Sequence, residues 1–277
     1  MAKLIHISAN RADDKQRHGG VRRSNQLRAN LLADFEFVLP PISTTSTISF
    51  IRYLAHWRKV PKGLTPRGYI KALIAIGLFI DFAKATGPDW TAYRFAIEVA
   101  RGPILYIGYA LSKLGINYVA LPHNIEFLVP GQFNSEASKG THFHIEAEIY
   151  RNASRIFTIS GFDKFIIGAI APKVETSVHS YYPDPTEVAR FKRILEERQN
   201  RRDHSSRILY IGTVKNPPTM AGLVQLVQAF SMLHNSKLEL HIAGFGTEIL
   251  QNTASKQIKI HGSTSDEVLN ELLVSSS

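Results

Sequence analysis

Residues 207–246 read RILYIGTVKNPPTMAGLVQLVQAFSMLHNSKLELHIAGFG. The apolar run 207–211 is followed by a polar loop that contains two prolines, and residues 219–234 then show helical spacing of apolar side chains. A second predicted strand, 238–243, is followed by Gly244-Phe245-Gly246. Two short apolar runs separated by a helix are typical of parallel strands joined by a crossover helix. The stretch therefore predicts an α/β domain built on a parallel sheet.

The same alternation extends in both directions from this stretch. A strand at 258–261 and a helix at 266–273 follow it, and a charged helix at 187–200 and a polar run at 201–206 precede it. Further strands are predicted at 4–7, 35–39, 94–99, 116–121 and 155–159, with a possible strand at 174–182. Helices are predicted at 21–33, 66–85, 102–114, 144–153 and 162–170, and residues 131–141 read as a polar loop.

This order of elements predicts two Rossmann-like parallel-sheet domains, residues 1–200 and 207–277. The second domain contains three predicted strands, whereas a doubly wound sheet usually has about five or six. We therefore expect the second domain to be incomplete.

Composition excludes several classes of protein. Of the 277 residues, 44% are hydrophobic and none is cysteine. The hydrophobic fraction excludes a wholly disordered chain. The absence of cysteine excludes disulfides, cysteine-ligated zinc and a thiol nucleophile. The N-terminus lacks the apolar core of a signal peptide, and the longest apolar run, 72–80, is far below the roughly 20 residues that span a bilayer. These features predict a cytoplasmic protein.

The net charge of +10 is confined to the first part of the chain. Residues 1–205 hold 28 basic and 18 acidic residues, whereas residues 206–277 hold five of each. No acidic residue lies between Glu36 and Asp81, and aromatic residues alternate with the basic ones there. The six basic residues of this interval are Arg52, Arg58, Lys59, Lys62, Arg67 and Lys71.

Three interpretations of this basic segment remain open. It can be a solvated face whose aromatic residues pack inward, it can bind anionic lipid headgroups, or it can bind nucleic acid phosphates. No nucleic-acid motif accompanies the charge, so no nucleic-acid partner is expected. The membrane interpretation predicts a peripheral protein on the inner face of the membrane.

Candidate binding residues stand where predicted strands end. Gly19 and Gly20 open the first helix, and His123, Asn124 and Glu126 follow the strand 116–121. Ligands of parallel sheets bind at the carboxyl ends of the strands, and a helix N-terminus favours anions. A histidine there can contact a sugar hydroxyl or transfer a proton.

The second domain shows the same arrangement after two consecutive strands. A lysine in the first loop could neutralise a diphosphate, and its polar neighbours could donate hydrogen bonds. Glycines in the second loop would let the backbone approach a nucleotide closely. The candidate donor-binding residues are Gly212, Thr213, Lys215, Asn216, Gly244, Phe245 and Gly246.

A metal site is not expected. His142, His144 and Glu146 alternate and would face one side of an extended segment. A helix that begins near His144 would scatter them, and the helix is the default interpretation.

In their order along the chain, several segments resemble the family-4 glycosyltransferases of the GT-B fold, the retaining nucleotide-sugar transferases. The resemblance spans nearly the whole chain. The segments that carry it are His18-Gly19-Gly20, Asn117 to Glu126, Ser154 to Ser160, Tyr182-Pro183, Leu209 to Gly212, Asn216, Leu240 to Gly246, Ile260-His261-Gly262 and Asp266-Glu267-Val268.

The resemblance implies two Rossmann-like domains, the first for the acceptor and the second for the nucleotide-sugar donor. It implies that His123 contacts the donor sugar as the catalytic histidine and that Gly19 and Gly20 lie by the donor phosphates and the acceptor. Lys215 would approximate the cation that stabilises the leaving diphosphate. It implies retaining transfer without a metal, with the nucleotide sugar as co-substrate and no other cofactor.

The sequence departs from the family pattern in two places. The family usually has an arginine and a lysine after the first strand of the second domain, and here only Lys215 is cationic. The paired-glutamate motif that holds the donor ribose and sugar, and the final crossing helix, would lie beyond residue 277. The chain is therefore interpreted as a truncated member: a fragment, a frameshifted product, or a piece that a separate C-terminal piece complements.

Three functions follow as alternatives. The first is transfer of a hexose to a glycan or lipid-linked acceptor, as in polysaccharide biosynthesis. The second is a catalytically incompetent remnant, or a piece of a split protein, that binds a glycan or a membrane surface. The third is another enzyme of this fold, such as a sugar-nucleotide epimerase.

Overall fold

The computed structural model describes residues 3–8, 10, 19–40, 42, 51, 53–87, 89–100, 102–133, 135–183, 185–201, 206–214, 217–233, 237–253 and 255–276. The chain divides into two compact units, Met1–Tyr182 and Pro183–Ser277. The division falls before helix α7 (Pro185–Gln199), which the sequence had placed in the first domain. Contacts with α9 (Asp266–Ser275) explain this, because Arg190 Nε donates to Asn270 Oδ1 at 2.7 Å.

The first unit is built on a six-stranded parallel sheet in the order β2-β1-β3-β4-β5-β6. The two neighbours of β1 are thus β2 on one side and β3 on the other, which makes the gap between β1 and β3 the point where the strand order reverses. Parallel sheets bind ligands at the carboxyl ends of the strands at such a point. The strands are β1 (Leu4–Ser8), β2 (Phe35–Val38), β3 (Arg94–Val99), β4 (Tyr118–Pro122), β5 (Arg155–Thr158) and β6 (Thr176–Val178).

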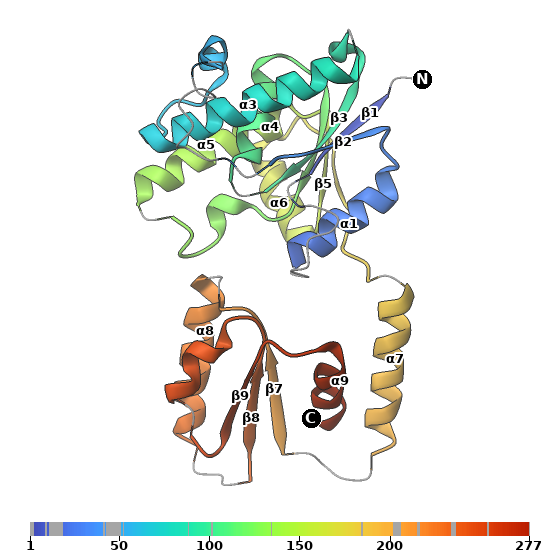
Figure 1. Ribbon diagram of the computed structural model, residues 1–277, viewed down its shortest axis with the longest axis vertical. Helices are drawn as coiled ribbons and strands as arrows, with labels where there is room; N and C mark the ends of the chain where they lie inside the picture. Colours follow the sequence, from blue (N-terminus) through green and yellow to red (C-terminus); the bar gives the residue numbers. More distant parts are fainter. Residues whose placement is uncertain are drawn as a thin grey trace. The chain divides into compact units, whose positions relative to one another are not determined.

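Helices cover both faces of this sheet (Figure 1). The main core packs α3 (Pro66–Thr86), α4 (Ile104–Lys113) and α5 (Glu136–Asn152) against side chains such as Ile5 and Ile97. On the opposite face, Leu27 of α1 (Gly19–Leu31) packs against Ala96 and Leu121. Helix α6 (Gly161–Ile170) follows β5.

Strand alternation places polar side chains on the face that α1 covers. Ile5 and Ile7 belong to the core on the other side, so His6 and Ser8 point toward α1. Ala96 lies on the α1 side of β3, and Glu98, two residues later, shares its face. The carboxyl ends of β1 and β3 therefore present buried polar groups to α1.

The short helix η1 (Leu54–Lys59) packs against α3 through the residue that precedes it, Tyr53. Tyr53, 4% exposed, lies against Gly77, and its hydroxyl donates to Asp81 Oδ2 at 2.9 Å. The N-terminus of α3 is fixed by Thr65, whose hydroxyl accepts the main-chain N–H of Gly68 at 3.1 Å. Residues 54–59 are thus a helical turn anchored on α3 through Tyr53.

Substitution of Gly77 by alanine should destabilise the first unit. A Cβ at this position would lie 2.2 Å from the Tyr53 ring. Overpacking a buried contact typically costs about 1–3 kcal/mol, which outweighs the roughly 1 kcal/mol that alanine gains over glycine in a helix. Urea unfolding of Gly77→Ala measures the loss. The control is Gly168→Ala in α6, where no atom lies within 4 Å; equal midpoints for the two variants would contradict the packing.

The second unit contains a parallel sheet in the order β7-β8-β9. Its strands are β7 (Arg207–Ile211), β8 (Glu239–Ala243) and β9 (Ile258–Gly262). Leu223 and Val227 of α8 (Pro217–Ser231) pack on Leu240 and Ile242, and Leu250 of η4 (Thr247–Thr253) joins this core. The βαβ unit expected from residues 207–246 is confirmed.

One predicted loop is wrong. Residues 131–141 were expected to be irregular, but α5 begins at Glu136. The Ser135 hydroxyl accepts the main-chain N–H of Ser138 at 3.2 Å and caps the helix. A serine N-cap starts a helix whatever the polarity of its first turns, so the apolar pattern placed the start too late.

Candidate functional site

The most buried polar cluster of the first unit surrounds Glu98, whose side chain is fully buried. The hydroxyls of Ser8 and Ser24 donate to Glu98 Oε1 and Oε2 at 3.0 and 2.7 Å. His6 Nε2 lies 3.0 Å from Oε1, and His123 Nε2 lies 3.1 Å from Oε2. Neither ring N–H is aligned well enough for a linear hydrogen bond, so both are close polar contacts. The carboxylate joins β1, β3, α1 and the residue after β4.

These contacts keep the carboxyl group ionised. Burial would raise the pKa of Glu98, but the adjacent His123 and His6 rings and the Ser24 hydroxyl together hold that pKa well below its usual range. A buried carboxylate needs such donors because an unpaired buried charge is costly.

Further polar groups extend the cluster toward α1. Asn10 Nδ2 donates to Ser24 Oγ at 2.9 Å, and Arg28 Nη2 donates to Ser8 Oγ at 2.9 Å. Arg23, also buried, donates through Nη1 to the Ser180 carbonyl at 3.4 Å. Burial lowers the pKa of Arg23, and the charge of Glu98 partly offsets that effect.

The residues predicted after β4 take different positions. His123 is 7% exposed and contacts Glu98, whereas Asn124 is exposed. Glu126 is buried, and its carboxylate accepts a hydrogen bond from Gln132 Nε2. Gly20 is half-buried at the start of α1, and Gly19 begins that helix.

Glu126 also lies beside a second buried acid. Its main-chain N–H donates to Oε1 of Glu146, which is fully buried in α5. Burial, and then the charge of Glu126, raises the pKa of Glu146 from 4.5 to about 8. Glu146 is therefore mostly protonated at neutral pH, and it is placed to bind the β4–α5 loop rather than a metal ion.

The predicted donor loops of the second unit lie side by side. Gly212 N–H donates to the Ala243 carbonyl at 3.0 Å, and Gly244 N–H donates to the Gly262 carbonyl at 2.8 Å. The Thr213 hydroxyl donates to the carbonyl of Phe245 at 3.2 Å, and the Phe245 side chain is 47% exposed. The three strand ends thus form one edge of main-chain groups and glycines.

Glycine is required at two positions of this edge. Gly244 has φ +136°, and a Cβ there would lie 1.8 Å from the Gly212 carbonyl oxygen. Gly246 has φ +82°, and its Cβ would lie 2.7 Å from Val214 Cγ2. Both conformations belong to the region that glycine adopts readily. Lys215 and Asn216, the predicted diphosphate ligands, lie outside the described residues.

A polar ladder lies on the face of the second sheet opposite α8. His261 Nε2 lies 2.9 Å from His241 Nδ1, and Lys259 Nζ donates to Glu239 Oε1 at 2.9 Å. Burial lowers the pKa of both histidines. Within the described ranges, no group of three or more histidine or acidic side chains is arranged to hold a metal ion.

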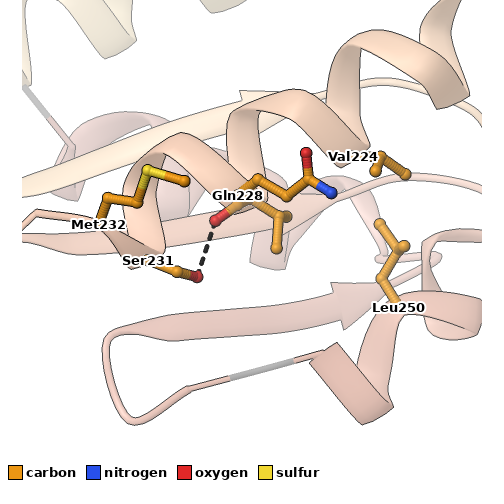
Figure 2. Close-up of a pocket in the computed structure, with 6 residues that line it drawn as sticks. Val224, Gln228, Ser231, Met232 and Leu250 are labelled. Carbon is orange, nitrogen blue, oxygen red and sulfur yellow. Dashed lines mark hydrogen bonds between the residues drawn. The ribbon is translucent and has the colours of Figure 1, made fainter.

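A hollow of about 380 Å³ opens on the second unit between α8 and η4 (Figure 2). Val224, Val227, Met232 and Leu250 line it with Gln228 and Ser231, and the Ser231 hydroxyl donates to the Val227 carbonyl at 2.8 Å. None of the predicted donor-binding residues lines this hollow, so it is not the predicted nucleotide site.

Sequence reasoning missed most of the Glu98 cluster. His6, Ser8, Ser24 and Glu98 were not singled out, although a lone acid in the apolar strand 94–99 and polar residues alternating with Ile5 and Ile7 were visible. The structure brings His123 to this cluster and brings Gly212 and Thr213 to the loop 244–246.

Comparisons with known proteins give a likeness of fold alone. No protein-family model matches the chain, and no curated protein matches it in sequence. A UDP-forming α,α-trehalose-phosphate synthase from Burkholderia xenovorans is 12% identical, with 99% of this chain and 76% of that chain covered and a TM-score of 0.60. The S. aureus MnaA–UDP structure is 11% identical, with 98% and 71% covered and a TM-score of 0.51.

Both similarities extend over both units of the chain. Each unit of the chain is built on a parallel sheet. The expected fold class is therefore confirmed: the chain has the GT-B fold, with two Rossmann-like units built on parallel sheets.

Proposed function

We propose that the chain is a glycosyltransferase that moves a hexose from a nucleotide-sugar donor to a glycan or lipid-linked acceptor, with retention of anomeric configuration. The observation that carries the proposal is the edge of the second sheet, where glycine loops after consecutive strands lie side by side. Glycine main chain at the carboxyl ends of parallel strands suits the phosphates of a nucleotide.

The proposed roles follow the family resemblance residue by residue. Gly212, Thr213 and the loop 244–246 bind the nucleotide, and Lys215 and Asn216 bind its diphosphate. His123 and Asn124 contact the sugar, with Gly19 and Gly20 near the donor phosphates and the acceptor. Glu126 supports this site from its buried position beside Glu146.

Calorimetric titration tests donor binding. Uridine nucleotides are the first probes, because one of the two similar proteins is a UDP-forming synthase and the other structure is a complex with UDP. We expect UDP and UDP-hexoses to bind, Lys215→Ala to weaken binding about 10-fold or more through loss of a charged hydrogen bond, and His123→Gln to leave UDP affinity unchanged. No heat with uridine, guanosine or adenosine diphosphate sugars would contradict the proposal.

A second observation favours a membrane-bound acceptor. Ile51, Leu54 and Trp57 are 62%, 42% and 55% exposed, and the Arg58 guanidinium lies over the Trp57 ring at 5.3 Å from its centroid. Arg58, Lys62 and Arg67 are exposed, Lys59 and Lys71 are partly exposed, and Arg52 lies outside the described residues. Tyr53 and Phe79 are buried whereas Trp57 is exposed, so only some of the aromatic residues between Glu36 and Asp81 pack inward.

This basic surface, residues 51–71, contacts the first turns of α5, since Thr141 Oγ1 donates to the Gly63 carbonyl at 3.4 Å. Figure 1 shows η1 and the starts of α3 and α5 at one end of the first unit. No helix in the described part of the chain could span a bilayer. We propose that residues 51–71 bind anionic lipid headgroups on the cytoplasmic side of the membrane.

Vesicle co-sedimentation tests this surface. Binding to phosphatidylglycerol vesicles should exceed binding to phosphatidylcholine vesicles and should fall about fivefold for each removed charge in Lys59→Ala and Lys62→Ala. Trp57→Ala should weaken it further through lost apolar burial. Lys173→Ala, an exposed lysine outside this surface, is the matched control. Equal effects of all these variants would contradict the assignment.

Binding and turnover measurements distinguish the alternative functions from sugar transfer. Vesicle or glycan binding without any nucleotide binding would favour a non-catalytic binding module or one piece of a split protein. Conversion of a sugar nucleotide without an acceptor would favour an epimerase.

A further inference from the structure

Glu98 is positioned to control one histidine. It lies in β3, and its Oε2 accepts a hydrogen bond from Ser24 and its Oε1 one from Ser8. His123 Nε2 lies 3.1 Å from Oε2, and His6 Nε2 lies 3.0 Å from Oε1. These four groups come from three separate segments of the chain, β1, α1 and the residue after β4, and their side chains are all buried.

His123 is fixed to β3 at two points. Its main-chain N–H donates to the Val99 carbonyl at 3.0 Å, and its Nε2 lies 3.1 Å from Glu98 Oε2. The ring therefore cannot turn without leaving the carboxylate. Since an ionised carboxylate only accepts hydrogen bonds, the ring atom that faces it must carry a proton.

The consequence concerns the other ring nitrogen. In the neutral imidazole one nitrogen donates and the other accepts, and a partner on one nitrogen decides the state of the other. With the proton held on Nε2, Nδ1 of His123 presents a lone pair. That atom can accept a hydrogen bond from a hydroxyl group of a ligand.

We propose that Glu98 is a positioning residue that holds His123 in the Nε2–H tautomer, so that Nδ1 accepts a hydrogen bond from a hydroxyl of the bound sugar. The proposal rests on the proposed function for the identity of the ligand but not for the tautomer. The Ser24 and Ser8 hydroxyls donate to the Glu98 carboxylate and hold its oxygens in the orientation that faces the two histidines.

Histidine 15N spectra of the intact, histidine-labelled wild-type chain test the tautomer without any activity. His123→Gln assigns the ring signals. We expect the proton on Nε2 alone of His123 at neutral pH, and a proton on Nδ1, with or without one on Nε2, would overturn the proposal. Glu36→Gln is the matched control, because Glu36 Oε1 lies 3.5 Å from His6 Nδ1 and its carboxylate contacts His6 and Arg28 rather than His123. It should leave the His123 signals in place.

Steady-state kinetics test the consequence for turnover. Glu98→Gln keeps the shape of the side chain but replaces one acceptor oxygen with a donor group. We expect kcat to fall about 100-fold with a small change in the KM for the donor, and no further fall when the substitution is added to His123→Gln. Independent, additive losses would overturn the proposal.

Donor turnover and the positioning role of Glu98 are distinguished by separate results. If the wild-type chain releases no nucleoside diphosphate from any sugar nucleotide, the proposed function fails while the tautomer result stands. If the wild-type chain is active and folded Glu98→Gln is equally active, the positioning role fails. Should Glu98→Gln not fold, the wild-type spectra decide the question.

Discussion

Gly244→Ala is expected to unfold the second unit. The added Cβ would lie 1.8 Å from the Gly212 carbonyl oxygen, at a φ of +136° that side chains rarely adopt. The main chain at Gly244 and at Gly212 cannot move apart without breaking hydrogen bonds. Gly244 N–H donates to the Gly262 carbonyl, and Gly212 N–H donates to the Ala243 carbonyl. Backbone strain and overpacking together should cost on the order of 3 kcal/mol or more.

Chemical denaturation followed by amide spectra measures this loss unit by unit. The signals of the second unit should collapse first, with loss of nucleotide binding, while those of the first unit persist. Gly222→Ala in α8 is the control, since no atom lies within 4 Å of its added Cβ and alanine favours a helix by about 1 kcal/mol. If Gly244→Ala unfolded at the Gly222→Ala midpoint, the tight approach of the two loops would be wrong.

Glu146→Gln is expected to stabilise the first unit, increasingly so as the pH rises. The pKa of Glu146 is raised by burial and by Glu126 from 4.5 to about 8. A carboxyl group whose folded pKa is raised contributes its stability below the unfolded pKa and loses it as pH rises through the folded value. The window is therefore about pH 4.5–8, and the loss at pH 7 is about 3 kcal/mol. A glutamine removes this loss and can still accept the Glu126 N–H.

Unfolding free energies of wild type and Glu146→Gln across pH 4–9 measure the effect. The two curves should converge near pH 4, separate as the pH rises above about 4.5 and stop separating above about pH 8, with the variant more stable. Glu148→Gln on the same helix is the control, because Glu148 is partly exposed and pairs with Lys113. It should change stability by less than about 1 kcal/mol with no such trend. Parallel curves for wild type and Glu146→Gln would contradict a protonated, buried Glu146.

Local patterns in the sequence were sufficient for most elements. The strands 94–99 and 207–211 appear with the bounds expected, because a short, mainly apolar run between turn signals predicts a strand. The start of α5 was missed because a serine cap, rather than an apolar stripe, determines where that helix begins. The ranges of α1 and α8 differ from expectation by a few residues at their ends.

The polar cluster around Glu98 depends on long-range pairing. Its members come from β1, α1, β3 and the residue after β4, and the register Leu4↔Arg94 and Val99↔Pro122 brings them together. Neither register can be read from one strand alone. Sequence reasoning could place His123 after a strand, but only the pairing of β3 with β4 shows that a buried carboxylate faces it.

Sugar transfer from a nucleotide donor is measured by analysis of the reaction products. The full chain is incubated with UDP-hexoses and a lipid-linked or glycan acceptor, and UDP release and the anomeric configuration of the product are measured by NMR. We predict UDP release that depends on acceptor, a product with the donor's configuration, and a large loss in His123→Gln. Nucleotide binding without any acceptor-dependent release, or release unchanged in His123→Gln, would contradict this account.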